Sequence, residues 1–317
     1  MARKLRVQYP GAIYHLMNRG DRREPIFRDD GDRQRFLETL GEACGKTGWQ
    51  IHAYCLMGNH FHLVAETPQA NLVAGMKWFL GTYTSRFNRR HQVFGHLFSG
   101  RYKALVVDGS DTGYLRSACD YVHLNPVRAK LLKVEEPLRE YKWSSYGKYL
   151  GTPGRRPGWL RVDRLWGEMG IRQDTAAGRR QFEVMTEERR RREGPGEWKG
   201  IRRGWCLGDE RFRQELLQAM REPMGRQYYA GTERKETDEA KAEHILAEEL
   251  KGRKWDGEEL KNRRKGDPEK VKVARRLRSE TTMTLDWITQ RLGMGTVGYA
   301  AQCLREANRK KYAILRD

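Results

Sequence analysis

Hydrophobic and polar positions along the first 150 residues switch between the two-residue period of strands and the 3.6-residue period of helices. The strand-like runs are short, rich in bulky residues and closed by turn residues such as Asn18-Arg19-Gly20. The predicted elements are strand 12–17, helix 33–44, strand 49–57, strand 60–66, helix 71–88, strand 102–108 and helix 112–125. This βαββαβα order predicts an α+β, ferredoxin-like domain over residues 9–150, with a four-stranded, mostly antiparallel sheet covered by helices on one face.

The pattern changes at residues 151–158, where Gly, Pro and Arg dominate and predict a domain boundary. Residues 151–266 are expected to form a basic helical and linker region. Residues 267–317 form an all-α region in which three helices are predicted, over 270–279, 285–292 and 296–310. The turn Gly293-Met294-Gly295 between the last two helices predicts a helix-turn-helix DNA-binding module. A plain three-helix bundle that docks on the first domain is the alternative.

Charge narrows the choice of partner. Lys and Arg number 62 against 42 Asp and Glu, a formal net charge of +20 over 317 residues. This excess favours DNA or another polyanion as partner. A merely soluble basic protein and an anionic membrane surface are the alternatives, but no apolar run approaches the roughly 18 residues that span a bilayer. No apolar stretch follows the basic residues at 3–6, so we expect no signal peptide, and the five cysteines are scattered. We therefore expect a cytoplasmic, nucleoid-associated protein with reduced thiols and no membrane partner.

The candidate chemistry lies in two short motifs. His60 and His62 follow the predicted turn Gly58-Asn59, and they share one strand face because successive side chains alternate. Tyr121 and Asn125 are four residues apart in the last predicted helix, a spacing that places both on one helix face. Two imidazoles and the Asn125 carbonyl oxygen suit a hard divalent ion such as Mg²⁺ or Mn²⁺. Tyr121 would then be the nucleophile that attacks a phosphodiester.

Each motif also has an ordinary structural explanation. Histidines at this spacing are often hydrogen-bonded structural residues, and a single tyrosine is usually a core residue. Tyr114 lies seven residues before Tyr121, on nearly the same stripe, but lacks the following Asn-Pro. His123 is about 200° around the helix from Tyr121 and should face away from it. The two motifs together are far more specific than either alone.

Several longer stretches carry a resemblance to a known family. They are YHLMNRG at 14–20, IF at 26–27, AYCLMGNHFHL at 53–63, GHLFSGRYK at 95–103, YVHLNPVRA at 121–129 and WSSY at 143–146. Through these stretches, residues 9 to about 150 resemble the REP-associated tyrosine transposases. These proteins have an IS200-like transposase domain and belong to the HUH superfamily of single-strand nucleases. The family commonly has proline where this chain has Gly58, a difference in the turn and not in a ligand.

The resemblance implies a metal-dependent strand transferase that nicks and rejoins single-stranded hairpin DNA through a phosphotyrosine. His60 and His62 match the metal-binding pair, Asn125 the third ligand and Tyr121 the nucleophile. The candidate DNA contacts are Arg19, Arg101, Lys103 and Arg128 in the first domain and Gln302, Arg305 and Arg309 in the last helix. A catalytically silent DNA-binding regulator is the alternative function, and the sequence leaves open whether the protein is a monomer or a homodimer.

Overall fold

The computed structural model forms two compact units, Met1–Tyr229 and Ala230–Asp317. It describes residues 7–110, 113–133, 135–194, 197–221 and 231–314, with side chains except at 203, 221, 231–238 and 308–314. Within these residues, no helix is both long enough and apolar enough to cross a membrane.

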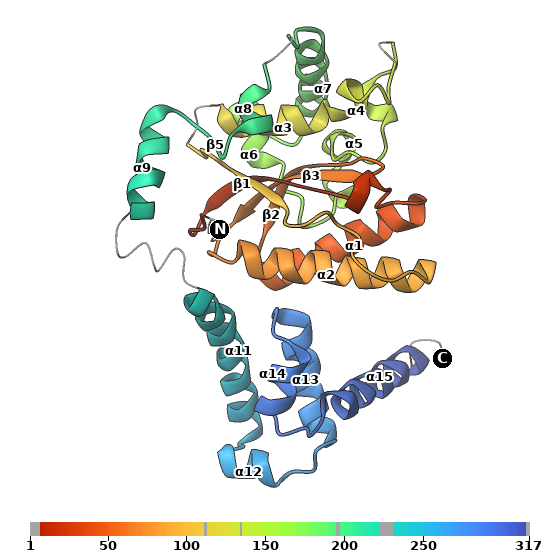
Figure 1. Cartoon of the computed structure of the whole chain (residues 1–317), viewed down its shortest axis with the longest axis vertical. Helices are drawn as coiled ribbons and strands as arrows, with labels where there is room; N and C mark the ends of the chain where they lie inside the picture. The colour runs from red at the N-terminus through yellow and green to blue at the C-terminus, as the bar shows by residue number, and fades with distance from the viewer. Residues whose placement is uncertain (1–6, 111–112, 134, 195–196, 222–230, 315–317) are drawn as a thin grey trace. The chain divides into compact units, whose positions relative to one another are not determined.

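A mixed sheet lies at the centre of the first unit (Figure 1), with the strand order β2-β3-β1-β4-β5. The strands are β1 (Ala12–Arg19), β2 (Gln50–Leu56), β3 (His60–Thr67), β4 (Lys103–Val107) and β5 (Cys206–Leu207). The first four strands pair antiparallel, whereas β5 joins the β4 edge in parallel. The α+β class and the four predicted strands are confirmed. The prediction of a four-stranded sheet missed β5, because two residues are too few to show a strand period.

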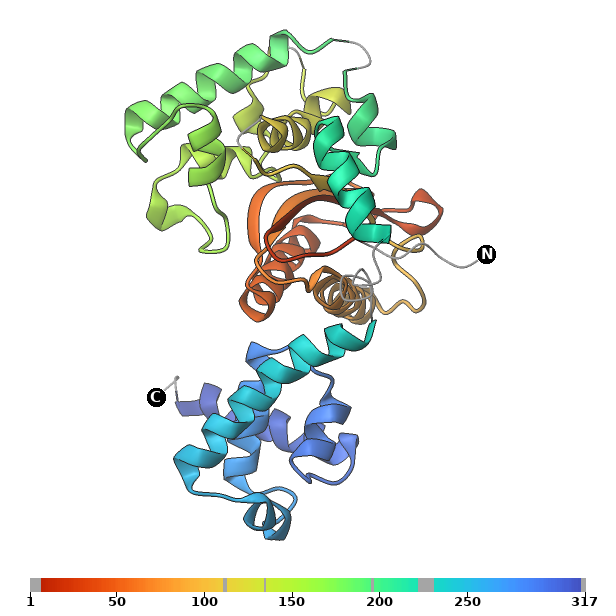
Figure 2. The ribbon, with the colours of Figure 1, turned by 90° about the vertical axis from the view of Figure 1, so that its left-hand side faces the viewer.

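Helices cover both faces of the sheet (Figures 1 and 2), which corrects the expectation of helices on one face. Helices α1 (Asp30–Thr47) and α2 (Leu72–His91) pack on one face, and α3 (Tyr114–His123) packs on the other. The consecutive residues Leu105 and Val106 of β4 are both buried, so this strand is apolar on its two sides. A strand of that kind requires cover on both faces.

Aromatic packing joins α1 and α2 to the sheet. The Phe36 ring lies 5.0 Å from the Phe61 ring and 4.8 Å from the Phe79 ring, measured between centroids. All three side chains are fully buried. Burial of each such ring stabilises the fold by about 1.5–3 kcal/mol. Asp29 caps the start of α1 by accepting a hydrogen bond from the Asp32 backbone N–H, and Gly48 ends the helix with φ 73°.

The other helical segments of the first unit follow α3. They are α4 (Asn125–Arg128), α5 (Tyr146–Leu150), α6 (Asp163–Glu168), α7 (Ala176–Arg191), α8 (Lys199–Arg203) and α9 (Glu210–Arg221), with the short 3₁₀ turns η1 (Asp21–Arg23), η2 (Leu138–Glu140) and η3 (Pro153–Arg155). Phe182 of α7 stacks on Tyr149 of α5 at 4.8 Å. Helices after residue 151 are therefore packed into the first unit.

The helix predicted over residues 112–125 is divided into two. Helix α3 ends at His123, and Asn125 begins α4, whose second residue is Pro126. Proline cannot donate the next backbone hydrogen bond, and its ring clashes with the preceding turn of an α-helix. Leu124, between the helices, keeps φ −82° and ψ −1°. The chain therefore stays compact at this joint, and Tyr121 and Asn125 occupy consecutive helices.

Within its described residues, the second unit contains helices and connecting turns but no strand. Its helices are α11 (Gly231–Arg253), α12 (Gly257–Asn262), α13 (Pro268–Glu280), α14 (Leu285–Arg291) and α15 (Val297–Ile314). The last three occur where the sequence predicted helices. Gly293 and Gly295 in the intervening turn have φ of 60° and 85°, a conformation that glycine adopts without a steric penalty. Leu292 and Met294 are fully buried in the same turn.

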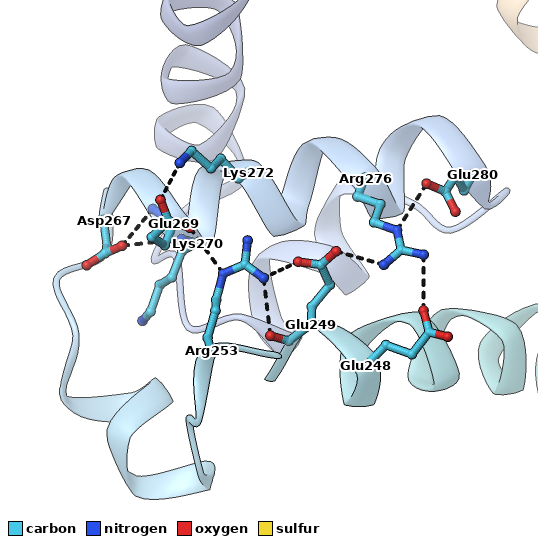
Figure 3. Close-up of polar contacts among 9 residues, drawn as sticks. All are labelled: Glu248, Glu249, Arg253, Asp267, Glu269, Lys270, Lys272, Arg276 and Glu280. Carbon is cyan, nitrogen blue, oxygen red and sulfur yellow. Dashed lines mark hydrogen bonds and ion pairs between the residues drawn. The ribbon is translucent and has the colours of Figure 1, made fainter. Parts of the chain in front are cut away.

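An ion-pair network links α11 to α13 (Figure 3). Arg276 of α13 donates to Glu248 at 3.1 Å and to Glu249 at 2.7 Å, both on α11. Helix α11 therefore belongs to the same compact unit as the three terminal helices. Along the sequence, the boundary between the two units falls between residues 229 and 230, inside the segment 151–266. The three-part division 9–150, 151–266 and 267–317 stays a prediction.

Candidate active site

The sheet register sets the candidate metal ligands side by side. Strand β3 pairs His60 with Arg19 and His62 with Met17 of β1, and Met17 pairs on its other side with Lys103 of β4. Paired residues on neighbouring antiparallel strands project from the same face. His60, His62, Arg19 and Lys103 therefore share the face that α3 covers.

His62 is buried, with 2% of its surface exposed, and is held by a third histidine. Its Nδ1 lies 2.9 Å from His15 Nε2, and the two rings stack with centroids 5.2 Å apart. Burial lowers the pKa of His62 well below its usual value, and it lowers the pKa of His15 to about 4. Both imidazoles are therefore neutral at pH 7, which is the state in which histidine binds a metal.

His60 lies at the start of β3 and is partly exposed. Its Nδ1 lies 2.7 Å from the side-chain oxygen of Asn59. Burial, followed by the charge of Arg19, lowers the pKa of His60 to about 4. The Nδ1 atoms of both candidate ligands thus have hydrogen-bond partners, and the Nε2 atoms are left for a ligand. A fixed Nδ1 is the usual arrangement for a histidine that binds a metal through its other nitrogen.

The ring of Tyr121 packs against two of these histidines, His15 and His62. Its ring centroid is 5.3 Å from that of His15 and 5.6 Å from that of His62. Only 8% of the Tyr121 surface and 7% of the Asn125 surface is exposed. The predicted nucleophile therefore packs against His62, one of the two candidate metal ligands, and against His15.

One cleft of about 2280 Å³ collects most of the predicted site residues. Its lining includes His60, His62, Tyr121 and Asn125 together with Arg19, Arg101, Lys103 and Arg128. The remaining predicted DNA contacts belong to the second unit. Gln302 and Arg305 are exposed on α15, whereas the side chain of Arg309 lies outside the described residues.

A divalent ion fits the donor set of this cleft if Asn125 contributes. Among the described side chains, no group of three or more His, Cys, Asp or Glu is arranged to hold a metal ion. Two neutral imidazoles with their Nδ1 atoms engaged can supply two ligands, and the amide oxygen of Asn125 in the same cleft is the available third. The fit to a metal depends on this asparagine.

Sequence reasoning missed two residues of the site. His15 supports His62 across the β1–β3 pair, and its signal was its place in a predicted strand with a pattern of alternating faces. Trp198 comes from residues 151–266, which the sequence predicted to be a basic helical and linker region, yet its ring lies 5.6 Å from the Tyr121 ring. No local pattern near residue 198 indicates that contact.

Comparison with known proteins gives one family. Residues 8–125 match the model of a family described as IS200-like transposase. A solved structure of a REP-associated tyrosine transposase bound to a REP hairpin is similar at 15% identity, covering 56% of this chain and 97% of that chain. The TM-score between the two structures is 0.40. The search of curated proteins found no match.

Proposed function

Because residues 8–125 belong to the family of IS200-like transposases, we propose that this protein nicks and rejoins one strand of DNA, with Tyr121 as the nucleophile. The observation that carries the proposal is the position of Tyr121, whose ring lies 5.6 Å from the His62 ring in the basic cleft. The two parts of the predicted chemistry come from elements about sixty residues apart in the sequence. Their meeting within one chain favours an active site that needs no second subunit.

The reaction is a transesterification. Tyr121 Oη attacks phosphorus and loses its proton, while the bond from phosphorus to one deoxyribose oxygen breaks and that oxygen becomes a hydroxyl. The energy of the phosphodiester is conserved in the phosphotyrosine. A hydroxyl at a strand end can then attack the same phosphorus and release the tyrosine, which rejoins the DNA.

His60, His62 and Asn125 would hold a divalent ion, for which Mg²⁺ and Mn²⁺ are the candidates. When bound, such an ion would polarise the phosphodiester and stabilise charge on the departing oxygen. Burial keeps both histidines neutral by lowering their pKa values, so each retains a lone pair for ligation. His15 fixes the orientation of the His62 ring through a hydrogen bond to His62 Nδ1, and Asn59 fixes the His60 ring through a hydrogen bond to His60 Nδ1.

Three basic residues of the cleft, Arg19, Arg101 and Lys103, would bind the DNA backbone. Arg101 and Lys103 are exposed at β4 and its approach, and Arg19 is adjacent to His60 through the strand register. We propose a single-stranded hairpin of the REP type as substrate, as the resemblance implies. The helix-turn-helix of the second unit would bind neighbouring duplex through α15, where Gln302 and Arg305 are exposed.

The test compares the wild-type protein with Tyr121→Phe and with the matched control Tyr114→Phe on a labelled library of hairpin DNAs. With Mn²⁺ present, the wild type and the control should form a covalent protein–DNA adduct, and Tyr121→Phe should form none. EDTA should abolish the adduct. Hairpin binding without any adduct in the wild type would instead support a DNA-binding regulator.

A further inference from the structure

The side chain of Arg128 is mostly buried and contacts Tyr121, the proposed nucleophile. Its guanidinium carbon lies 4.3 Å from the centroid of the Tyr121 ring, within the range of a cation–π interaction. Its Nη2 donates a hydrogen bond to the backbone carbonyl of Tyr121. That carbonyl is among the last four of α3, which lack a partner within their own helix. One side chain thus contacts both the ring and the backbone of Tyr121.

Glu193, which follows α7, fixes the opposite side of Arg128. Arg128 Nη1 donates to Glu193 Oε1 at 3.0 Å, and each of the two side chains is 13% exposed. The same Glu193 oxygen accepts a hydrogen bond from Trp198 Nε1. The ion pair is therefore mostly shielded from water, and a second donor holds its carboxylate in place.

Trp198 completes the surroundings of the tyrosine ring. Its ring lies 5.6 Å from Tyr121 and 5.3 Å from the guanidinium carbon of Arg128. Arg189, at the end of α7, lies 5.1 Å over the same indole. The Tyr121 ring consequently has His15 and His62 as neighbours, and also Arg128 and Trp198.

We propose that Arg128, held by Glu193, is a positioning residue that fixes the Tyr121 phenol for attack. This inference rests on the proposed function of Tyr121. The alternative is a direct phosphate contact, as expected from the sequence. Both terminal nitrogens of Arg128 already donate to protein oxygens, and Glu193 offsets its charge. These contacts favour a role in orienting Tyr121 over a role in binding a DNA phosphate.

The two possible roles of Arg128, positioning Tyr121 and binding a DNA phosphate, predict different effects of its substitution on the reaction rate and on DNA affinity. A small displacement of a reacting group costs about 100-fold in rate without weakening substrate binding. A lost phosphate contact, by contrast, weakens binding and leaves the rate at saturating DNA nearly unchanged.

The experiment measures two quantities for Arg128→Met, Arg128→Lys and Glu193→Gln. The first is the single-turnover rate of adduct formation at saturating hairpin DNA with Mn²⁺. The second is the hairpin Kd, measured by fluorescence anisotropy with each substitution placed in the Tyr121→Phe background. Arg139→Met is the matched control, because Arg139 pairs with Glu183 of α7 at 3.1 Å but is exposed and outside the cleft lining.

We expect Arg128→Met to lower the rate about 10–100-fold with the Kd within about twofold of its reference. Arg128→Lys should recover part of the rate, and the double variant Arg128→Met/Glu193→Gln should be no slower than Arg128→Met. The control should match the wild type in both quantities. Circular dichroism and Tm identify any variant that fails to fold, and Trp198→Phe then provides a milder test, with an expected two- to tenfold loss of rate.

A tenfold or larger rise in Kd with an unchanged saturating rate would overturn the inference and make Arg128 a phosphate contact. An unchanged rate and Kd in folded Arg128→Met would overturn it as well. The absence of an adduct in the wild type would refute the proposed function itself, and that result is distinct because it appears before any Arg128 variant is compared.

Discussion

The hydrogen bond between His15 and His62 allows a prediction about metal affinity, because His15 can be substituted while all three proposed ligands are kept. In His15→Phe the new ring preserves the volume of the old one, but His62 Nδ1 loses the partner that now lies 2.9 Å away. Because His62 is only 2% exposed, little water is available to replace that partner. A buried donor without a partner costs about 1–3 kcal/mol. Loss of such an outer contact lowers metal affinity by about 10–100-fold.

The assay is calorimetric titration of Mn²⁺ into Tyr121→Phe with and without His15→Phe, together with urea unfolding. His52→Phe is the matched control, because His52 is also fully buried and bonded, at 3.0 Å to Glu66, yet does not line the cleft. Both histidine variants should lose stability, and only His15→Phe should lose Mn²⁺ affinity. A Mn²⁺ affinity that changes less than twofold in a folded His15→Phe protein would refute the assigned role of His15.

Two further predictions concern the stability of the first unit, measured by urea unfolding. Gly75→Ala should destabilise by about 1–3 kcal/mol, because its Cβ would lie 2.2 Å from Trp49 Cζ2. Gly81→Ala in the same helix meets no atom within 4 Å and should stabilise by about 0.5–1 kcal/mol; equal effects would contradict the packing. Burial raises the pKa of Glu66, but His52 and a neighbouring arginine outweigh it and hold the pKa at about 2. The stability that the ionised Glu66 contributes is present above pH 4.5 and is lost as the pH falls toward 2. In Glu66→Gln, the free energy of unfolding should therefore fall by about 1–2 kcal/mol less over this pH range than in the wild type, after allowance for the partial exposure of Glu66. An unchanged acid slope would argue against these ion pairs.

Local patterns predicted the parts of the fold whose causes are local. The four main strands and the helices that carry Phe36 and Phe79 follow from hydrophobic periodicity, and their positions in the structure agree with it. The second face of helices was missed because burial on both sides of β4 depends on segments that follow it in the chain. The same reason applies to β5, which exists only through its pairing with β4.

The candidate site divides in the same way. The shared face of His60 and His62 was predictable from strand geometry, and the strand register agrees with it. The surroundings of Tyr121 were not predictable, because Trp198, which contacts its ring, and Glu193, which pairs with Arg128, come from more than seventy residues later in the chain. Arg128 illustrates the limit most clearly. Its charge suggested DNA, whereas its contacts are with Tyr121 and Glu193.

The central claim is that Tyr121 becomes covalently attached to DNA, and trypsin offers a direct test. Cleavage after Arg116 and Arg128 releases the peptide Ser117–Arg128, which contains Tyr121 and separates it from Tyr114. After incubation with a hairpin substrate and Mn²⁺, followed by nuclease and trypsin, mass spectrometry should find a nucleotide on Ser117–Arg128. A nucleotide on the peptide with Tyr114, or an active protein with no modified tyrosine, would contradict the account.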